Sequence, residues 1–215
     1  MERNFEEIMD FVEREIIPRY NSFDRGHGTD HARTVISQAL QLAQYYPEVD
    51  TCLLLVAAAY HDLGLVHGRE LHHIHSAAIV RDDARLRQWF TADEINTIAD
   101  AAEDHRASSD HEPRTIYGRI VAEADRIIDS ETIVRRALQY GMRHEPGLDR
   151  EGQYRRLMEH MREKYDYGGY LQLWIPHGEN ARRLEEFRRL LADEQAFRQL
   201  FDTTYDTLNN YIKQS

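Results

Sequence analysis

Histidine is the residue type that stands out in this sequence, because nine of its 12 histidines lie between positions 27 and 111. One of them, His61, is followed by Asp62 directly after the longest apolar run, Cys52–Tyr60. Burying an imidazole and a carboxylate there costs free energy unless both find a partner. A divalent metal would be such a partner, since it accepts the imidazole nitrogen and neutralises the carboxylate. For the dipeptide alone we favour the simpler interpretation, in which Asp62 begins the turn at Gly64 and His61 packs in the core.

Two further side chains have both a structural and a metal-binding interpretation. His31 falls in the first turn of a predicted helix, where a histidine alone would be interpreted as exposed to solvent. Asp125 lies in the segment IVAEADRII, three or four residues from apolar positions on either side, so it shares or borders their helix face. In the alternative interpretation, Asp125 is a surface carboxylate that pairs with Arg126 or Arg119. An aspartate beside an apolar stripe is less typical of that alternative.

Taken in order, His31, His61-Asp62 and Asp125 resemble the H…HD…D signature of the HD-domain superfamily of metal-dependent phosphohydrolases. The local contexts agree: H-x-x-x-V opens a helix, A-A-A-Y-H-D-L-G closes an apolar one, and E-A-D-R-I follows later. The resemblance covers about residues 20–130, or roughly half of the chain. It implies an all-α, HD-type helical bundle and a first metal site formed by His31, His61, Asp62 and Asp125.

Two more histidines resemble those that hold a second ion in the HDIG-like subgroup with two metals. His72 lies four residues before a pair of small residues, and His105 lies twenty residues before Asp125. The resemblance implies that Asp62 bridges the two ions. Two ions a few ångströms apart can clamp the attacking and leaving oxygens of a phosphoryl transfer.

Spacing alone leaves the choice of the second-ion ligands open. It favours His72 over two near neighbours, which are His73 and His75. His111 is the alternative to His105. If only one metal is bound, the resemblance implies that His72 and His105 contact the phosphate instead, and with Asp62 they form the predicted catalytic set.

The resemblance also implies the cofactor and the reaction. One or two divalent transition metals per chain are expected, from among Fe, Mn, Co, Ni and Zn, with Mg as an alternative at the second site. The implied reaction is hydrolysis of a phosphoester in a nucleotide or another small phosphorylated metabolite, with water activated by the metal. Two alternatives use the same fold: a di-iron oxygenase, since these ligands suit iron, and a catalytically inactive nucleotide-sensing protein.

Phosphate recognition needs cationic side chains beyond the metals. The candidates are Arg106, beside a predicted ligand, and Lys164, beside the aromatic segment YDYGGY. The tyrosines of that segment could stack on a base, but we favour packing of the C-terminal helices as their role. Leu65 and Val66 stand where the guanosine tetraphosphate hydrolases carry an acidic pair, which disfavours that substrate.

Charge and composition narrow the partners and the location. The 27 Lys and Arg residues against 38 Asp and Glu give a net charge of −11, which argues against stable binding of nucleic acid or of an anionic membrane. No apolar run approaches the roughly 20 residues that span a bilayer. The single cysteine, Cys52, excludes a disulfide framework. We expect a cytoplasmic protein that binds a small phosphorylated substrate, as a monomer or a homodimer.

The elements that would position these residues are all predicted to be helices, because apolar residues recur at helical spacing and no period-2 alternation is sustained. We expect a single HD-type domain over residues 1–215, with a motif-bearing core at about 20–130 and C-terminal helices at about 131–215 packed on it. The predicted helices lie at about 5–16, 30–46, 51–62, 72–89, 92–105, 113–128, 130–140, 153–165, 179–191 and 193–211.

Local signals indicate where several of these helices begin. Thr29 or Asp30 can cap the second helix, and Asp50 can cap the third. Thr91, with Glu94 three residues on, predicts a capping box, and Pro113 suits the first turn of a helix. The segment 141–152 is predicted to be a loop.

Overall fold

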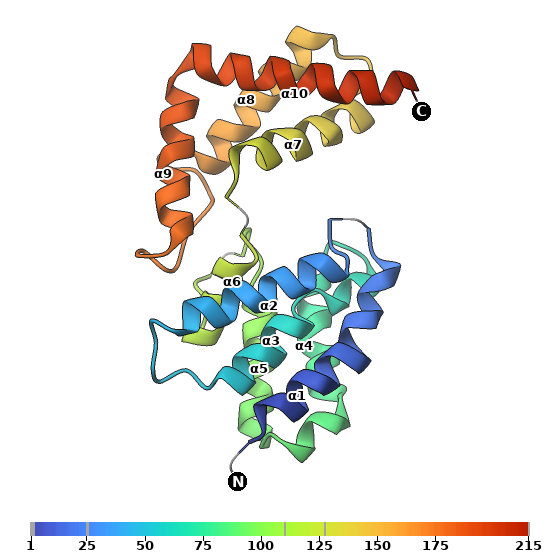
Figure 1. Ribbon diagram of the computed structural model, residues 1–215, viewed down its shortest axis with the longest axis vertical. Coiled ribbons are helices and arrows are strands. Elements are labelled where there is room, and N and C mark those ends of the chain that lie inside the picture. The colour runs from blue at the N-terminus through green and yellow to red at the C-terminus, as the bar shows by residue number, and fades with distance from the viewer. Residues whose placement is uncertain (1–2, 25, 110, 127, 215) are drawn as a thin grey trace. The chain divides into compact units, whose positions relative to one another are not determined.

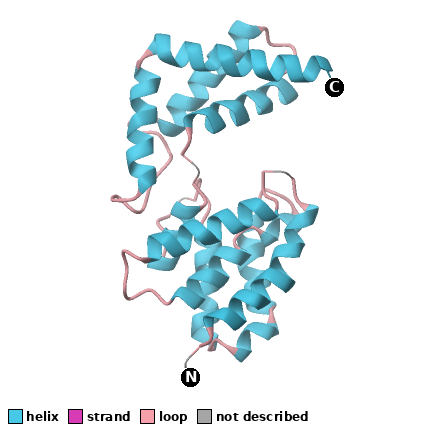
Figure 2. Ribbon diagram, in the orientation of Figure 1, coloured by secondary structure: helices cyan, strands magenta, loops and turns pink. Residues whose placement is uncertain are grey.

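The computed structural model describes residues 3–24, 26–109, 111–126 and 128–214. In this part of the chain all regular elements are helices (Figure 1), and Figure 2 shows no strand among them. The all-α fold expected from the sequence is therefore confirmed. The chain divides into two compact units, Met1–Arg126 and Ile127–Ser215. The expected packing of the C-terminal helices on the core within one domain stays a prediction.

The helices of each unit follow one another with short connections. Those of the first unit are α1 (Phe5–Phe11), η1 (Val12–Ile16), η2 (Ile17–Ser22), α2 (Thr29–Ala43), α3 (Thr51–Tyr60), η3 (Leu63–His67), α4 (His72–Asp82), η4 (Ala84–Gln88), α5 (Ala92–Asp104) and α6 (Ile116–Ala124). Those of the second unit are α7 (Ser130–His144), α8 (Arg150–Tyr165), α9 (Glu179–Ala192) and α10 (Glu194–Gln214).

Helix α3 is the central element of the first unit. Every residue of Cys52–Tyr60 is buried, as expected for a helix that is apolar on nearly every side. Helices α2, α5 and α6 pack against it, and α1 and α4 make further contacts (Figure 1). Asp50 caps its N-terminus as predicted, because its carboxylate accepts the backbone N–H groups of Cys52 and Leu53.

No single helix in the described residues is both long and apolar enough to cross a membrane. One pair of segments, Thr51–His67 with His72–Asp82, is long and apolar enough only when the two are taken together, and the chain bends by 116° between them. The first member of that pair comprises the buried helix α3 and the following turn η3.

Helix α4 is shorter than the predicted helix over 72–89. It ends at Asp82, and a separate 3-10 turn, η4, follows. The Asp83 carboxylate explains the break, because it accepts a hydrogen bond of 2.7 Å from the Tyr60 hydroxyl and also accepts the backbone N–H of Arg85. The end of α4 thus combines a local cap of η4 by Asp83 with a contact to the core helix α3.

The predicted N-terminal boundaries are right for α3 and α5, and those of α6 and α2 differ from the structure. Thr91 and Glu94 form the predicted capping box at the start of α5. Helix α6 begins at Ile116 rather than at Pro113, since the Thr115 hydroxyl accepts the backbone N–H three residues on and fixes the first turn there. Helix α2 already includes Thr29 and Asp30, and the residue that precedes it is Gly28. The first predicted helix is α-helical only to Phe11 and continues as π and 3-10 turns to Ser22.

The second unit packs its four helices around apolar and aromatic side chains. Helix α7 contacts α8 and α10, and α9 contacts the same two helices. The loop expected over 141–152 is shorter, because α7 continues to His144 and the Asp149 carboxylate caps α8 through the N–H of Gly152. Its buried core side chains include Leu157, Met161, Phe187, Phe197 and Phe201.

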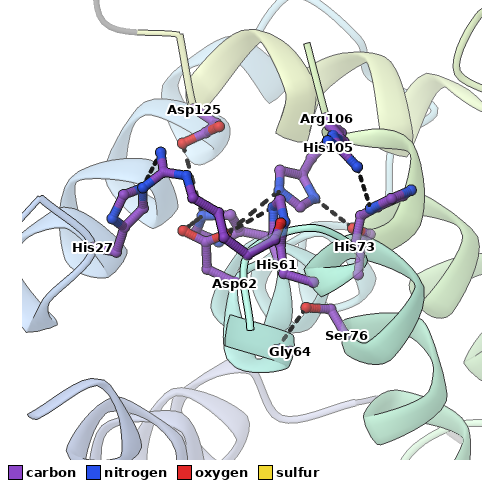
Figure 3. A network of polar contacts seen from close by, with 12 residues as sticks. His27, His61, Asp62, Gly64, His73, Ser76, His105, Arg106 and Asp125 are labelled. Carbon is purple, nitrogen blue, oxygen red and sulfur yellow. Dashed lines mark hydrogen bonds and ion pairs between the residues drawn. The ribbon is translucent and has the colours of Figure 1, made fainter. Parts of the chain in front are cut away.

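Gly64 lets η3 lie directly against α4. A Cβ atom at this position would lie 2.0 Å from the carbonyl oxygen of His72 and 2.6 Å from the backbone nitrogen of Ser76. The Gly64 N–H also donates to the Ser76 hydroxyl at 2.9 Å (Figure 3). The segment that follows Asp62 is therefore held against the N-terminal turn of α4 at backbone contact distance.

We predict that Gly64→Ala lowers the free energy of unfolding by more than about 2 kcal/mol, because the methyl group would collide with backbone that has nowhere to move. Urea denaturation measures the change. Gly147→Ala is the matched control, since a Cβ at Gly147 meets nothing within 4 Å. Equal stability of the two variants would contradict the close packing of η3 on α4.

Candidate metal centre

Six side chains from five helices of the first unit converge on one point, and each comes from a helix end. His31 lies in the first turn of α2 and His72 is the first residue of α4. His61, His105 and Asp125 are the residues that follow α3, α5 and α6, and Asp62 comes directly after His61. Figure 3 shows His61, Asp62, His105 and Asp125 turned toward one another. The structure thus brings together all six residues that the sequence analysis proposed as ligands.

The first cluster joins His31, His61, Asp62 and Asp125. The Nε2 atom of His31 lies 3.1 Å from Oδ1 of Asp125 and 3.6 Å from Oδ2 of Asp62. The Nε2 atom of His61 lies 3.3 Å from the same oxygen of Asp62 and 3.8 Å from Oδ1 of Asp125. The donor atoms of His31, His61 and Asp62 all lie within 4.8 Å of one another, and Asp125 adjoins this group through its contacts with the two histidines.

The second cluster uses the other oxygen of Asp62. Its Oδ1 atom lies 3.4 Å from Nε2 of His72 and 3.5 Å from Nε2 of His105, and these two nitrogens are 3.1 Å apart. One carboxylate therefore contributes an oxygen to each cluster, which places two groups of metal-type donors side by side.

These distances suit a metal ion at each cluster. Ligands about 2.1 Å from an ion lie about 3.0 Å apart at right angles and about 3.4 Å apart in a tetrahedron. The Nε2 atoms of His31 and His61 are buried and make no hydrogen bond of ordinary geometry within the described residues. A buried nitrogen in that state is costly unless its lone pair has an electrophilic partner. The residues present therefore fit a divalent cation.

Backbone carbonyls orient three of the imidazoles. The Nδ1 atoms of His61 and His72 lie 2.8 Å from the carbonyl oxygens of Ala58 and Arg69, and Nδ1 of His105 contacts the carbonyl of Ala102 in the same way. Donation from Nδ1 leaves the lone pair on Nε2, which is the atom that faces the cluster in each case. The tautomer needed for metal binding is thus set by main-chain geometry.

Tyr20 supports the end of α3, and the sequence analysis did not single it out. Its hydroxyl donates to the carbonyl of Ala59 at 2.9 Å and accepts the backbone N–H of Asp62 at 3.4 Å. Tyr20 is separated from Asp62 by 42 residues, so only the folded structure reveals the contact.

The pKa values of the clustered side chains indicate that positive charge is favoured at this position. Burial lowers the pKa of His31, but its contacts with Asp125 and Asp62 outweigh burial and raise this pKa to about 9. Burial raises the pKa values of the two carboxyl groups, yet the surrounding imidazoles hold both well below their usual range. Burial and the neighbouring His105 lower the pKa of His72 to about 4. Without a cation, a proton on His31 neutralises part of the first cluster.

The structure distinguishes among the histidines that spacing left open. His72 faces Asp62, whereas Nδ1 of His73 lies 3.4 Å from a guanidinium nitrogen of Arg106. The ring of His75 packs 5.0 Å from that of His67. His111 is exposed, and its Nδ1 is 2.9 Å from the carbonyl oxygen of Glu112.

The two residues predicted to contact substrate, Arg106 and Lys164, lie in different units of the chain. Arg106 follows His105 directly, and its guanidinium contacts the carbonyl of Glu70 and the Ser108 hydroxyl. Figure 3 shows its side chain beside His73. Lys164 lies in the last turn of α8 in the second unit, with its ammonium over the rings of Tyr165 and Tyr170. Substrate binding by either residue stays a prediction.

We predict that Asp62→Ala loses the ions of both clusters, because it removes a donor from each, whereas His105→Ala loses only the ion of the second cluster. Elemental analysis of protein purified without chelator gives the metal content per chain. Asp93→Ala is the control, since Asp93 is exposed in the first turn of α5, at the end opposite His105. Equal metal content in wild type and Asp62→Ala would contradict the shared carboxylate.

We also predict that metal binding releases protons below pH 9. At pH 7 the raised pKa of His31 keeps its imidazole protonated in the metal-free protein, so an ion at the first cluster must displace that proton. The apparent affinity should rise about tenfold per pH unit from pH 7 to 9 and then level off. Calorimetric titration in two buffers of different ionisation enthalpy counts the protons. Heats that do not depend on the buffer at pH 7 would contradict the prediction.

Comparison with known proteins identifies a family. Residues 28–128 match the model of the HD domain, and this segment includes all six side chains of the two clusters. The chain matches no curated protein and no solved structure. The matched segment contains the helix ends of α2 to α6 that carry the clusters, so the sequence match and the geometry agree. Over residues 28–128, slightly less than half of its length, the chain is similar to the HD-domain family.

Proposed function

We propose that the chain is a metal-dependent phosphohydrolase that acts on a nucleotide or another small phosphorylated metabolite. The observation that carries this proposal is the position of the Asp62 carboxylate, whose two oxygens face two separate sets of imidazole nitrogens. HD domains generally belong to metal-dependent phosphohydrolases, which supports hydrolysis. Divalent ions held there would lower the pKa of water, so that hydroxide is available near neutral pH, and would offset charge on the phosphate oxygens.

The residues of the chain have distinct roles in this proposal. His31, His61 and Asp125 would hold one ion, His72 and His105 the other, and Asp62 both. Because the backbone fixes the imidazole rings, the donor atoms need little reorientation when a substrate enters. Arg106, beside the second cluster, would donate to phosphate oxygens. Lys164 remains a second candidate for that contact.

Two other functions are compatible with the same fold. A di-iron oxygenase would use the same ligand types, since imidazole and carboxylate suit iron as well as zinc. An inactive nucleotide-sensing protein would need no turnover. No contact in the described residues specifically favours oxygen chemistry. Two intact groups of metal-type donors, with Asp125 in contact with the first, favour turnover over sensing.

We predict that the metal-loaded protein releases orthophosphate or pyrophosphate from at least one member of a panel of nucleotides and sugar phosphates. Asp62→Asn should lower kcat/KM by at least about 100-fold, because the amide cannot neutralise two ions and offers only one oxygen. Phosphate release under identical metal loading is the measurement, with Asp93→Asn as the control of equal charge change.

The outcomes separate the three functions. Turnover that is unchanged in Asp62→Asn would contradict hydrolysis at this centre. Oxygen consumption without phosphate release would identify the oxygenase. Tight nucleotide binding without turnover for any of the metals would identify the sensor.

A further inference from the structure

Arg69 places a guanidinium on the side of the centre where His31 lies. Its carbonyl oxygen accepts Nδ1 of the ligand His72, and one guanidinium nitrogen lies 3.5 Å from Nε2 of His27. The ring of His27 lies 5.8 Å from that of His31, and its Nδ1 is 3.0 Å from a carboxylate oxygen of Asp24. With Nδ1–H donated to Asp24, Nε2 of His27 can accept from Arg69 and hold the guanidinium there.

Arg106 occupies the side where the second cluster lies. Its guanidinium contacts the carbonyl of Glu70 and lies 3.4 Å from Nδ1 of His73. Glu70 is the residue after Arg69, so both guanidiniums are tied to the same short segment before α4. One cation therefore approaches the centre from each side of that segment.

Within the described residues no carboxylate lies at ion-pair distance from Arg69 or Arg106. Asp24, which contacts His27, attracts the Arg69 guanidinium only from farther away. Other arginines of the same unit differ: Arg33 pairs with Glu13, and Arg114 pairs with the buried Asp104. Arg69 is exposed and Arg106 half-buried, so both can reach a ligand. Polar partners that carry no full charge hold them in place and leave their charge available.

The charge at the centre indicates what kind of ligand it suits. The two carboxylates of the clusters and Asp24 bring three negative charges, two divalent ions would bring four positive ones, and the two guanidiniums add two more. The local surplus of about three positive charges lies in a chain whose net charge is −11. One phosphate group carries about −1.5 to −2 at pH 7 and would leave a third or more of the surplus uncompensated. Two or three linked phosphates would neutralise most of it.

We propose that Arg69 and Arg106 bind a second phosphate group, so that the substrate class is an organic di- or triphosphate rather than a monophosphate. The guanidiniums would take the phosphate that does not lie over the ions, through charge-assisted hydrogen bonds. This inference rests on the proposed function, which it narrows. Arg69 is its decisive residue, because the sequence gives it no motif and its side chain contacts none of the six metal-type donors within the described residues.

The test is anion binding measured by calorimetry with the Mn²⁺-loaded protein. Methylenediphosphonate, which is not hydrolysed at the P–C–P bridge, serves as the linked pair of phosphates and orthophosphate as the single one. We expect wild type to bind the diphosphonate at least about 10-fold more tightly than orthophosphate. Arg69→Gln should remove most of this difference while changing orthophosphate affinity less than about twofold, and Arg69→Lys should restore part of it.

Arg87→Gln is the control variant. Arg87 is exposed, precedes α5, and has no carboxylate at ion-pair distance within the described residues, so the same charge is lost at the other end of a helix about 20 Å long. Its diphosphonate affinity should match that of wild type. Metal content after each titration confirms that the diphosphonate has not removed the ions.

Each outcome bears on one proposal or the other. If Arg69→Gln weakens both anions equally, or neither, the second phosphate site is wrong, even where the protein hydrolyses phosphomonoesters. If wild type prefers orthophosphate, the inference also fails. If the diphosphonate binds through Arg69 but no phosphoester is hydrolysed, the anion site stands and the proposed function fails.

Discussion

The first unit depends on one costly group, the carboxylate of Asp62, which is buried among four imidazole rings. It follows a helix that is apolar all round, so water cannot solvate it. Only positive charge can offset that cost, which explains why its pKa is held low and that of His31 is raised to about 9. The two carboxylates among the six metal-type donors are stabilised by positive charge. A protonated His31 supplies part of that charge.

The centre is assembled at helix ends, and this makes its geometry a property of the main chain. A histidine that follows a helix can donate a hydrogen bond from its Nδ1–H group to the carbonyl three residues earlier, since the last carbonyls of a helix have no partner within it. His61 and His105 use this arrangement, and His72 uses a carbonyl of the preceding turn. Ring orientation thus needs no dedicated second layer of side chains, and the local fold positions the donor atoms directly.

Sequence reasoning selected side chains that converge in the structure, because their chemistry is tied to helix context; their role as ligands stays a prediction. The apolar run of α3 predicted a buried helix, and Asp62 after it was unusual for a core residue. Choosing His72 over His73 required three-dimensional distances, because adjacent residues differ by only 100° around a helix. The roles of Tyr20, His27 and Arg69 beside the centre could not be predicted from the sequence, because their contacts join residues about 40 positions apart. The early end of α4 could not be fully predicted for the same reason, since Tyr60 contributes to it from another helix.

Helix α3 is enclosed on all sides, so it can neither roll nor slide without exposing apolar surface to water. The inner half of the centre, built on its end, is therefore mechanically fixed. Any adjustment to the shape of a bound molecule falls to the outer half, where His27, Arg69 and Arg106 approach from connecting segments. Under the proposed function, changes in those segments would alter which organic group is accepted, while the half that would hold the ions stays constant. The fold would then separate the part that performs chemistry from the part that selects its target.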